Sequence, residues 1–421
     1  MQQNVFTLLK ERGFVKQSTD EEGIRELLSG SPITFYAGFD PTADSFHVGN
    51  LALIMAMSHL QRAGHRAIAL LGGGTALIGD PSGRTEARPM MAQETIDANS
   101  ARLRLQLAQF LTLDEEERGM LLDNALWLCE ARYIDFLREV GAHFRVNEMV
   151  KTETYRERME RGEGLSFLEF NYQLLQAYDY LQLFHKYRCV LQIGGSDQWG
   201  NMIAGVDLVR RKERKLVYVF TIPLVTAAGG KKMGKTAAGA VWLDAEKTSP
   251  YEFYQYWINV DDGDVERFLL LFTFLPAEEI RKLASAQGAA LRDAKARLAF
   301  EVTTLVHGEA EAKRAREGAH AAFGGGEDGD ASAVPTITIS RTRLAQGIPI
   351  VDLLVETGLS ASKGAARRLI AQGGVSIGGA TISSPDAIMR EKQLLDNNAF
   401  LLRAGKRRYH RVVVENGAHS R

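Results

Sequence analysis

Two lysines, Lys232 and Lys235, lie three residues apart in a glycine-rich stretch, and the hydroxyl of Thr236 directly follows the second lysine. Ammonium groups on a mobile loop can close over phosphates and neutralise negative charge that develops during a reaction. A solvated lysine loop without a ligand is the alternative interpretation.

A second candidate for phosphate binding is His47, which follows a strand pattern that ends near Phe39 and a turn that contains Pro41. Asp44 is expected to cap the next helix, which places His47 in the first helical turn. Free backbone N–H groups and the helix dipole favour an anion there, and Gly49 leaves room for a flat ligand such as a purine. An ordinary capped helix with a surface histidine is the alternative.

Tyr172, Gln176 and Asp179 are spaced so that they project from one stripe of a helix, and Leu168 and Leu175 border that stripe. A phenol, an amide and a carboxylate that face the interior need hydrogen-bond partners, so they can line a pocket for a small polar molecule. An internal hydrogen-bond network without a ligand is the competing interpretation.

Asp197 follows two glycines at the end of a strand pattern and precedes a helix. A carboxylate at this place can accept hydrogen bonds from ribose hydroxyls, although it can also simply cap the turn. The segment 79–83, with the sequence GDPSG, is by itself typical of a surface turn.

The segments that carry these residues alternate between strand and helix patterns. Short apolar runs bounded by glycine predict buried strands, and a periodic apolar pattern predicts a helix over 45–63. Strands that alternate with helices form parallel sheets, and ligands bind beyond the carboxyl ends of such strands. The predicted strands cover residues 33–39, 66–71, 189–193 and 217–222.

The other regions differ in pattern and charge. Helical patterns cover 114–159 and, without a strand signal, 249–323, and a run of glycines, acids and small residues then forms a solvated linker. From residue 337 onward the chain has 13 Lys and Arg against 6 Asp and Glu, whereas the full chain has 51 against 52. We predict an α/β domain over 1–222 with a helical insertion at about 114–160, a mobile loop over 223–246, a helical domain over 247–323, a linker over 324–336 and a small basic module over 337–421.

The composition is that of a globular protein, with 421 residues of which 45% are hydrophobic and 24% charged. It excludes a disordered or fibrous chain. No run approaches the roughly 18 apolar residues of a membrane-spanning helix, and the charged first thirty residues do not resemble a secretion signal. The two cysteines, Cys129 and Cys189, are far apart, which argues against disulfides and structural zinc and predicts a cytoplasmic location without membrane partners.

Taken together, five motifs occur in one order between residues 47 and 236: HxGN at 47–50, GDPSG at 79–83, YxxxQxxD at 172–179, GGSDQWGN at 194–201 and KMGKT at 232–236. This series resembles the class I aminoacyl-tRNA synthetases, and among them the bacterial tyrosyl-tRNA synthetases. The resemblance implies a Rossmann-like parallel-sheet catalytic domain, a small helical domain on the anticodon side and a C-terminal α+β RNA-binding module.

The resemblance also implies a role for each matching residue. The phosphates of ATP and the leaving pyrophosphate would be contacted by Thr42, His47, Arg84, Arg88, Lys232, Lys235 and Thr236. The nucleoside would be held by Gly49, Asn50, Gly195 and Asp197, with Asp40 and Gln198 close to the reacting groups. Tyrosine would be bound by Tyr36 and Asp179 at its phenolic hydroxyl and by Asp80, Tyr172 and Gln176 around its ammonium group.

Some positions depart from the family pattern. Asn50 stands where the signature has its second histidine, which keeps a hydrogen-bond donor but loses a titratable group. Ala37 replaces a frequent cysteine, Gly234 replaces a serine of the lysine loop, and Arg84 replaces a frequent lysine. The guanidinium fork of Arg84 can still bind phosphate in a bidentate manner, so none of these changes removes a group that the mechanism requires.

The implied reaction joins tyrosine to ATP as tyrosyl-adenylate, releases pyrophosphate and transfers the tyrosyl group to the terminal adenosine of tRNA(Tyr). No arrangement of serine, cysteine or histidine suggests a covalent enzyme intermediate. ATP is a substrate that brings Mg²⁺, without a dedicated carboxylate cage in the chain, and no tightly bound organic cofactor is expected. The family is dimeric, and we assign the interface to 127–159 and the nearby Phe167.

The basic module resembles the small RNA-binding module of a ribosomal small-subunit protein over 358–377. Its cations form two groups, which are Lys363, Arg367 and Arg368 near one helical face and Arg403, Lys406, Arg407, Arg408 and Arg411 further on. Such charges bind phosphates with strong salt dependence and little base readout. A basic face without a partner is the alternative.

Two other functions share parts of this pattern. A tryptophanyl-tRNA synthetase has the same fold and signatures, but the pairing of Tyr36 with Asp179 and the basic module argue against it. Phenylalanine is disfavoured because it would leave both of these buried groups unpaired. A non-catalytic RNA-binding relative is disfavoured by the presence of His47, Lys235 and Asp197.

Overall fold

The computed structural model describes residues 3–82, 90–162, 164–226, 233, 235–236, 239–285, 287–322, 334–391, 398–405 and 408–415. The chain divides into two compact units. The first contains Met1–Lys235 and Asp261–Ser285, and the second contains Thr236–Val260 and Ala286–Arg421. In the described part of the chain, no helix combines the length and the apolar character needed to cross a membrane.

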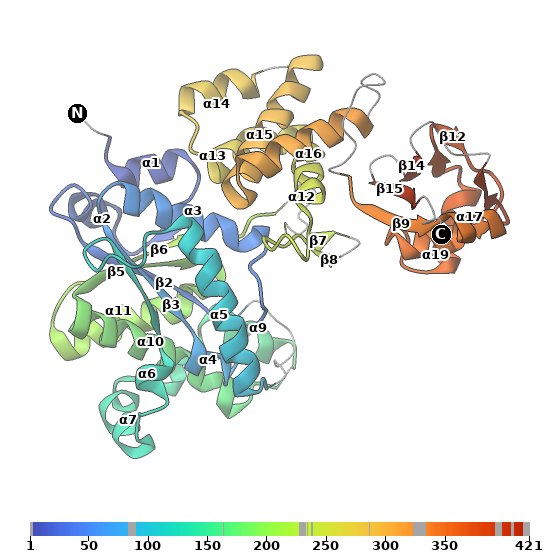
Figure 1. Cartoon of the computed structure of the whole chain (residues 1–421). Coiled ribbons are helices and arrows are strands. Elements are labelled where there is room, and N and C mark those ends of the chain that lie inside the picture. Colours follow the sequence, from blue (N-terminus) through green and yellow to red (C-terminus); the bar gives the residue numbers. More distant parts are fainter. Residues whose placement is uncertain are drawn as a thin grey trace. The chain divides into compact units, whose positions relative to one another are not determined.

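The first unit is built on a six-stranded sheet with the order β1-β6-β5-β2-β3-β4 (Figure 1). Its strands are β1 (Gln17–Ser18), β2 (Thr34–Phe39), β3 (Arg66–Leu71), β4 (Gly119–Asp123), β5 (Cys189–Gly195) and β6 (Tyr218–Ile222). Neighbouring strands are parallel except β1, which pairs antiparallel with β6. The four strands expected from short apolar runs are confirmed, because a buried parallel strand needs little else than such a run.

Helices pack on the two sides of this sheet (Figure 1). On one side α3 (Val48–Arg62) contacts β3 and β5, and on the other α10 (Phe167–Tyr187) and α11 (Trp199–Glu213) pack on each other and on β5. Tyr36, Ile68 and Leu70 share an apolar cluster with residues of α10 and α11. The other helices of this unit are α1 (Val5–Glu11), α2 (Glu21–Leu27), α4 (Gly73–Ala76), α5 (Gln93–Phe110), α6 (Ala125–Leu128), α7 (Tyr133–Glu139), α8 (Val146–Met149), α9 (Glu153–Glu160), α13 (Val265–Phe272) and α14 (Ala277–Ala284).

Two local expectations are wrong. The helical pattern over 114–159 contains the strand β4, which pairs in parallel with β3. Periodicity cannot separate a strand from a helix in so short an apolar run, and the pairing with β3 decides the outcome. Asp44 does not cap the next helix, because His47 has extended backbone geometry and is itself the N-cap, so α3 begins at Val48.

The sequence assigns 261–285 to the helical domain, whereas in the structure these residues pack with the first unit. The buried guanidinium of Arg12 donates to the carbonyl oxygens of Leu270 at 2.9 Å and Thr273 at 2.8 Å, and also to that of Leu275. The last carbonyls of a helix have no partner within the helix, so a cation is favoured at this end of α13. Arg12 thereby ties the N-terminal segment to α13.

In the second unit, the helices α12 (Pro250–Ile258), α15 (Ala289–His307) and α16 (Glu309–Ala322) pack pairwise on one another. Ser249 and Glu252 form a capping box at the start of α12, and Pro250 occupies its first position. The helical pattern expected for this region is confirmed. The short strands β7 (Lys235–Thr236) and β8 (Gly239–Ala240) pair with each other before α12.

The C-terminal part of the second unit is an α+β arrangement, as predicted. Its five-stranded sheet has the order β12-β11-β14-β15-β9. The elements are β9 (Thr336–Ser340), α17 (Arg341–Gln346), β10 (Ile348–Pro349), α18 (Ile350–Glu356), α19 (Lys363–Ala371), β11 (Val375–Ile377), β12 (Ala380–Thr381), β13 (Ile388–Met389), β14 (Ala399–Ala404) and β15 (Arg408–Glu415). One apolar cluster, which includes Leu353, Ile370 and Leu402, joins the helices to the sheet.

Candidate active site

The residues that the motifs supply lie at the carboxyl edge of the first unit's sheet. Asp40 directly follows β2, Gly72 follows β3, Asn124 follows β4, and Asp197 lies two residues after β5. The chain passes from β2 to β3 on one side and later reaches β5 on the other side of β2, so the strand order reverses between β2 and β5. Ligands of open parallel sheets bind at such a reversal.

Tyr36 and Asp179 form a buried pair of polar groups. Asp179 on α10 is 3% exposed and accepts hydrogen bonds from Asn124 Nδ2 at 2.9 Å and Trp127 Nε1 at 2.7 Å. The hydroxyl of Tyr36 on β2 has no hydrogen-bond partner among the described residues, although the side chain is 1% exposed. A buried hydroxyl without a partner is costly, so an incoming polar group would be bound favourably at this place.

Burial controls the proton affinity of this pair. It raises the pKa of Asp179 to about 7, while hydrogen bonds from Asn124 and Trp127 oppose the shift and the charge of Asp40 adds to it. Burial, followed by the charge of Asp179, raises the pKa of Tyr36 well above its usual value. The phenol of Tyr36 therefore stays neutral and can donate a hydrogen bond, and Asp179 can accept one.

A continuous hydrogen-bond chain leads from Asp179 to the end of β2. Asn124 Nδ2 also donates to Thr75 Oγ1 at 3.1 Å, and Thr75 Oγ1 donates to Asp40 Oδ1 at 2.8 Å. The hydroxyl of Tyr172 donates to the other oxygen of Asp40 at 2.9 Å. The carboxylates of Asp179 and Asp40 are thereby held at fixed positions at the two ends of one network.

The sequence did not point to Thr75, Asn124 or Trp127 as site residues, and it placed Trp127 at the start of the predicted dimer interface. Asn124 accepts from the backbone N–H of Gly74 at 2.9 Å and so joins the segments after β3 and β4. A polar residue directly after a parallel strand is the signal that could have identified Asn124. The signal was missed because β4 was not recognised as a strand.

The GDPSG segment is not a surface turn. Asp80 is 8% exposed and accepts from the backbone N–H of Ser82 at 2.9 Å and from Gln198 Nε2 at 2.7 Å. Asn201 Nδ2 donates to Gln198 Oε1 at 3.3 Å. The structure therefore joins this segment to the GGSDQWGN motif, because a buried carboxylate needs donors that the turn alone does not provide.

His47 and Asn50 meet at the start of α3, where His47 N donates to Asn50 Oδ1 at 3.1 Å. A Cβ on Gly49 would lie 2.8 Å from Cε1 of His47. Glycine at this position therefore makes room for the imidazole ring, not only for a ligand. The carbonyl oxygen of Met233 in the lysine loop lies 3.8 Å from the same Cβ position, and Thr42 is exposed in the turn before the helix.

Several expected site residues are not placed by this geometry. Arg84, Arg88, Lys232, Lys406 and Arg407 lie outside the described residues, and only the backbone of Lys235 and Thr236 is described, as β7. Gln176 is half-buried on α10, and a Cβ on Gly195 would lie 2.5 Å from Asp197 Oδ1, so the glycine allows this carboxylate to approach the end of β5. Within the described ranges, no group of three or more His, Cys, Asp or Glu side chains is arranged to hold a metal ion.

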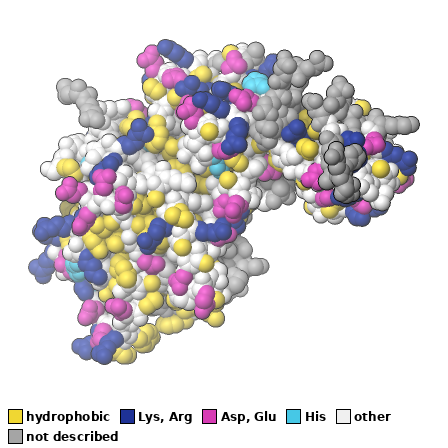
Figure 2. Space-filling model, viewed as in Figure 1, with side chains coloured by type: hydrophobic (Ala, Val, Ile, Leu, Met, Phe, Trp, Pro, Cys, Tyr) yellow, Lys and Arg dark blue, Asp and Glu magenta, His cyan; other side chains and the backbone are white. Residues whose placement is uncertain are grey.

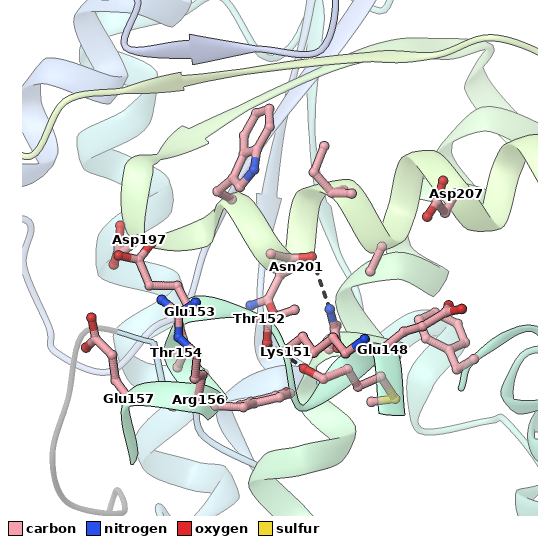
Figure 3. Close-up of a pocket in the computed structure, with 18 of the residues that line it drawn as sticks. Glu148, Lys151, Thr152, Glu153, Thr154, Arg156, Glu157, Asp197, Asn201 and Asp207 are labelled. Atoms are coloured by element: carbon pink, nitrogen blue, oxygen red, sulfur yellow. Dashed lines mark hydrogen bonds between the residues drawn. The ribbon is translucent and has the colours of Figure 1, made fainter. Parts of the chain in front are cut away.

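A pocket of about 870 Å³ lies beside this site (Figure 3). It is lined mainly by α8, α9 and α11, and it reaches the site through Gln173, Asp197 and Asn201. Its wall carries both signs of charge; Arg145 Nη1, for example, lies 3.8 Å from Glu148 Oε1. The sequence did not predict this pocket, because its walls come from segments that are far apart along the chain.

The described cations of the basic module are accessible. Lys363, Arg367, Arg368, Arg403 and Arg408 are exposed. Lys363 Nζ lies 2.8 Å from Asp352 Oδ1, and Arg403 Nε donates to a backbone carbonyl at 2.9 Å. Exposed cations of this kind can meet a phosphate backbone.

The sheet, the residues at its carboxyl edge and the start of α3 define a class I aminoacyl-tRNA synthetase. A family model described as "tRNA synthetases class I (W and Y)" matches residues 28–324, and one described as "Tyrosine--tRNA ligase SYY-like C-terminal domain" matches 327–412. The tyrosine–tRNA ligase of Clostridium tetani is 52% identical over 415 residues, which cover 99% of this chain and 100% of that protein. The chain therefore belongs to the tyrosine–tRNA ligases of class I.

Further relatives agree with this family. The tyrosine–tRNA ligase of Desulfatibacillum aliphaticivorans is 51% identical over 430 residues, which cover 98% of this chain and 99% of that protein. Among solved structures, a C-terminally truncated mitochondrial tyrosyl-tRNA synthetase of Aspergillus nidulans is 33% identical, with a TM-score of 0.68. The match covers 75% of this chain and 93% of that structure.

Proposed function

We propose that the chain activates L-tyrosine with ATP at the carboxyl edge of the first unit's sheet and then charges tRNA(Tyr). The tyrosine carboxylate attacks the α-phosphorus of ATP in line, a new O–P bond forms, and the bond to pyrophosphate breaks. A ribose hydroxyl of the terminal adenosine of the tRNA then takes the tyrosyl group and releases AMP. Catalysis depends on positioning and on charge stabilisation.

The observation that carries this proposal is the unsatisfied hydroxyl of Tyr36 in the same buried site as Asp179. A substrate phenol donates to Asp179 and accepts from Tyr36, so every polar atom of the pair is satisfied. Phenylalanine leaves both groups unpaired, and tyrosyl-tRNA synthetases are themselves the standard example of such discrimination. Tryptophan can donate from its indole nitrogen but offers no acceptor to Tyr36.

The opposite end of the amino acid is assigned to the acidic side of the site. Asp80, Tyr172 and Gln176 surround the substrate ammonium group in this proposal, and Asp40, which accepts from Tyr172, lies close to the reacting groups. The carboxylates favour a cation, and the contact between Asp80 and Gln198 supports a place for Gln198 next to the reacting carboxylate.

ATP is assigned to the start of α3 and the end of β5. Asp197, Gly195 and Asn50 hold its ribose, while Thr42 and His47 face its phosphates. The side chains that neutralise the leaving pyrophosphate are Arg84, Arg88, Lys232, Lys235 and Thr236. Mg²⁺ arrives as part of the substrate, because this ion is usually held by phosphate and water oxygens with few protein ligands.

Tyrosine-dependent exchange of pyrophosphate into ATP tests the proposed function. The protein is expected to exchange with tyrosine and to have a kcat/KM lower by about 10³-fold or more with phenylalanine or tryptophan. A preference for tryptophan would support the tryptophanyl alternative. Absence of exchange with all three amino acids would support the non-catalytic one.

We propose that tRNA contacts the chain at two places. The exposed cations of the C-terminal module bind its phosphates, and the pocket beside Asp197 takes its acceptor end. The second assignment is supported by the position of the pocket, since a ribose hydroxyl of the tRNA must reach the adenylate, and by cations such as Lys151 and Arg156 that line it (Figure 3).

Removal of the chain after Pro335 is expected to leave pyrophosphate exchange within about twofold of the full chain and to lower kcat/KM for tRNA charging by about 10²-fold or more. The reason is that several phosphate contacts are lost together, each with its counterion release. Charging by both proteins is measured at 50 and 200 mM salt. The kcat/KM of the full chain is expected to fall more steeply with salt than that of the truncated chain. Equal charging by both proteins would refute the role of the module.

We infer a homodimer formed through the first unit. Its large apolar side chains that are 56–69% exposed include Leu126, Tyr133, Ile134, Val146, Met159 and Phe167. They fall on α6 to α10, and Figure 2 shows hydrophobic side chains gathered around α7 at the lower end of the first unit. A second copy of the chain is the proposed partner, because soluble monomers rarely expose a large contiguous apolar patch.

The double substitution Tyr133→Asp with Ile134→Asp is expected to convert dimers to monomers in sedimentation velocity, because two charges would be buried without partners. The matched control is Leu105→Asp, since Leu105 is 69% exposed and belongs to α5, which is not one of the helices of the proposed interface. The control is expected to remain dimeric. A dimeric double variant would remove α7 from the proposed interface.

We place the enzyme in the cytoplasm. Cys129 and Cys189 are both free, the first exposed and the second buried. An exposed thiol persists in a reducing compartment, which supports this location. No membrane partner is proposed.

A further inference from the structure

We propose that α5 fixes the turn 41–47, which carries Thr42 and His47, and that Asn99 and Gln106 are its positioning residues. The proposal rests on the proposed function of Thr42 and His47 at the phosphates of ATP. The turn joins β2 to α3 and contains no regular helix or strand that could fix its shape through its own backbone. Its geometry therefore depends on contacts with another element in addition to short-range hydrogen bonds such as that from Thr42 N to the carbonyl oxygen of Asp40 at 2.8 Å.

The first contact is at the beginning of the turn. Asn99 is 7% exposed, and its Nδ2 donates to the carbonyl oxygen of Pro41 at 2.9 Å. This carbonyl belongs to the peptide group that joins Pro41 to Thr42. Its hydrogen bond therefore sets the direction of the peptide plane from which Thr42 continues.

The second contact is at the end of the turn. Gln106 is 9% exposed, and its Oε1 accepts from the backbone N–H of Phe46 at 2.8 Å, one residue before His47. Its Nε2 donates to Ser45 Oγ at 3.0 Å, and that hydroxyl donates to the carbonyl oxygen of Phe46 at 2.8 Å. Gln106 thus satisfies buried polar groups of the turn immediately before the N-cap of α3.

The two contacts come from one face of α5. Asn99 and Gln106 are seven residues apart, which is two helical turns, and Arg102 between them lies 3.8 Å from Asp44 in the same turn. Leu103, adjacent on this face, is 2% exposed. One face of α5 therefore contacts the turn at its beginning, its middle and its end.

The C-terminal end of α5 is hydrogen-bonded to α3, which fixes the position of α5 relative to α3. Ser58 Oγ of α3 donates to the carbonyl oxygen of Phe110 at 3.2 Å. The amide of Gln61 donates to the carbonyl oxygen of Thr112 at 2.8 Å and accepts from its N–H at 2.9 Å. α5 and the residues just after it therefore contact both the C-terminal end of α3 and the turn that precedes the N-terminus of α3.

The contacts of α5 are expected to affect the binding and reaction of ATP and not the binding of tyrosine. Asp179 is held by hydrogen bonds from Asn124 and Trp127, and neither of these residues accepts or donates in the hydrogen bonds of α5 described above. When the turn loses its fixed shape, the groups that face the phosphates lose their alignment, and displacements near 1 Å can cost about 10²-fold in rate.

Asn99→Ala and Gln106→Leu in the full chain test the proposal. Each is expected to lower kcat/KM for ATP in tyrosine-dependent pyrophosphate exchange by about 10- to 100-fold. The dissociation constant for tyrosine, measured by fluorescence titration without ATP, is expected to stay within about twofold. Gln106→Glu keeps an acceptor for the N–H of Phe46 and is expected to recover activity to within about fivefold of the wild type.

Two controls separate positioning from stability. Gln109→Leu makes the same substitution at an exposed position of α5 and is expected to behave as wild type. Leu103→Ala lowers the melting temperature through a cavity. If Asn99→Ala and Gln106→Leu both keep the wild-type kcat/KM for ATP, this inference is wrong while the proposed function stands. The same conclusion holds if their loss of activity is proportional to their loss of melting temperature and is equal for tyrosine and ATP. Absence of tyrosine-dependent exchange in the wild type overturns the proposed function and the inference with it.

Discussion

Replacing Asp179 by alanine is expected to lower kcat/KM for tyrosine in pyrophosphate exchange by about 10³- to 10⁴-fold. The substrate hydroxyl loses its acceptor inside a buried site, and the side-chain N–H groups of Asn124 and Trp127 lose the carboxylate that satisfies them. Activity with phenylalanine is expected to change far less, so the ratio of the two kcat/KM values should collapse. Steady-state exchange with each amino acid measures this ratio.

A second variant keeps this prediction testable if Asp179→Ala folds poorly. Tyr36→Phe removes a hydroxyl that has no partner among the described residues, so the fold is expected to be unaffected and the melting temperature unchanged. Its kcat/KM for tyrosine should fall by about 10- to 100-fold, the cost of one lost hydrogen bond in a buried site. Tyr178→Phe, one residue before Asp179 and half-buried, is the matched control. Undiminished discrimination in both Asp179→Ala and Tyr36→Phe would contradict the assignment of the phenol pair.

Changing Lys232 or Lys235 to alanine is expected to slow adenylate formation by about 10²- to 10³-fold while tyrosine binding to the free enzyme changes little. The lysines meet charge that develops on the leaving pyrophosphate, so their contribution appears in the transition state and not in the complex with tyrosine. The main chain of Met233, between the two lysines, lies near the start of α3, which supports this placement. Rapid quench of a single turnover measures the chemical step directly.

Lys215→Ala provides the control, because Lys215 is an exposed lysine of the first unit outside the loop. Its single-turnover rate is expected to equal that of the wild type. If both loop variants also retain that rate, the lysines do not act on pyrophosphate. A loss of tyrosine affinity equal to the loss of rate would instead indicate a structural role.

The parts of the fold that the sequence predicts are those with strong local signals. The strands β2, β3, β5 and β6 are apolar runs with glycine or polar boundaries, and α10 shows both its apolar stripe and its polar stripe at helical spacing. The stripe placed Tyr172 and Asp179 on one side of the helix, and the structure connects both to one network through Asp40 and Asn124. Local pattern was sufficient there because packing agrees with propensity.

The remaining features depend on tertiary contacts. β4 is a strand because β3 offers an edge for pairing, and nothing within its five residues records that edge. Asp80 is buried because Gln198, more than one hundred residues later, supplies a donor. The N-cap falls on His47 instead of Asp44, and the turn before it is hydrogen-bonded to Asn99 and Gln106 of α5, more than fifty residues later. These partners are far away along the chain, so local sequence patterns cannot reveal them.

The contact between Arg12 and the end of α13 also constrains the order of events during translation. Arg12 and Leu270 are 258 residues apart. A ribosome that adds about 5–20 residues per second needs roughly 10–50 s to cover that interval. During this interval the guanidinium of Arg12 has no carbonyl acceptors from α13 and stays in contact with water. A nascent chain that ends before residue 270 lacks the acceptors that allow this charge to be buried.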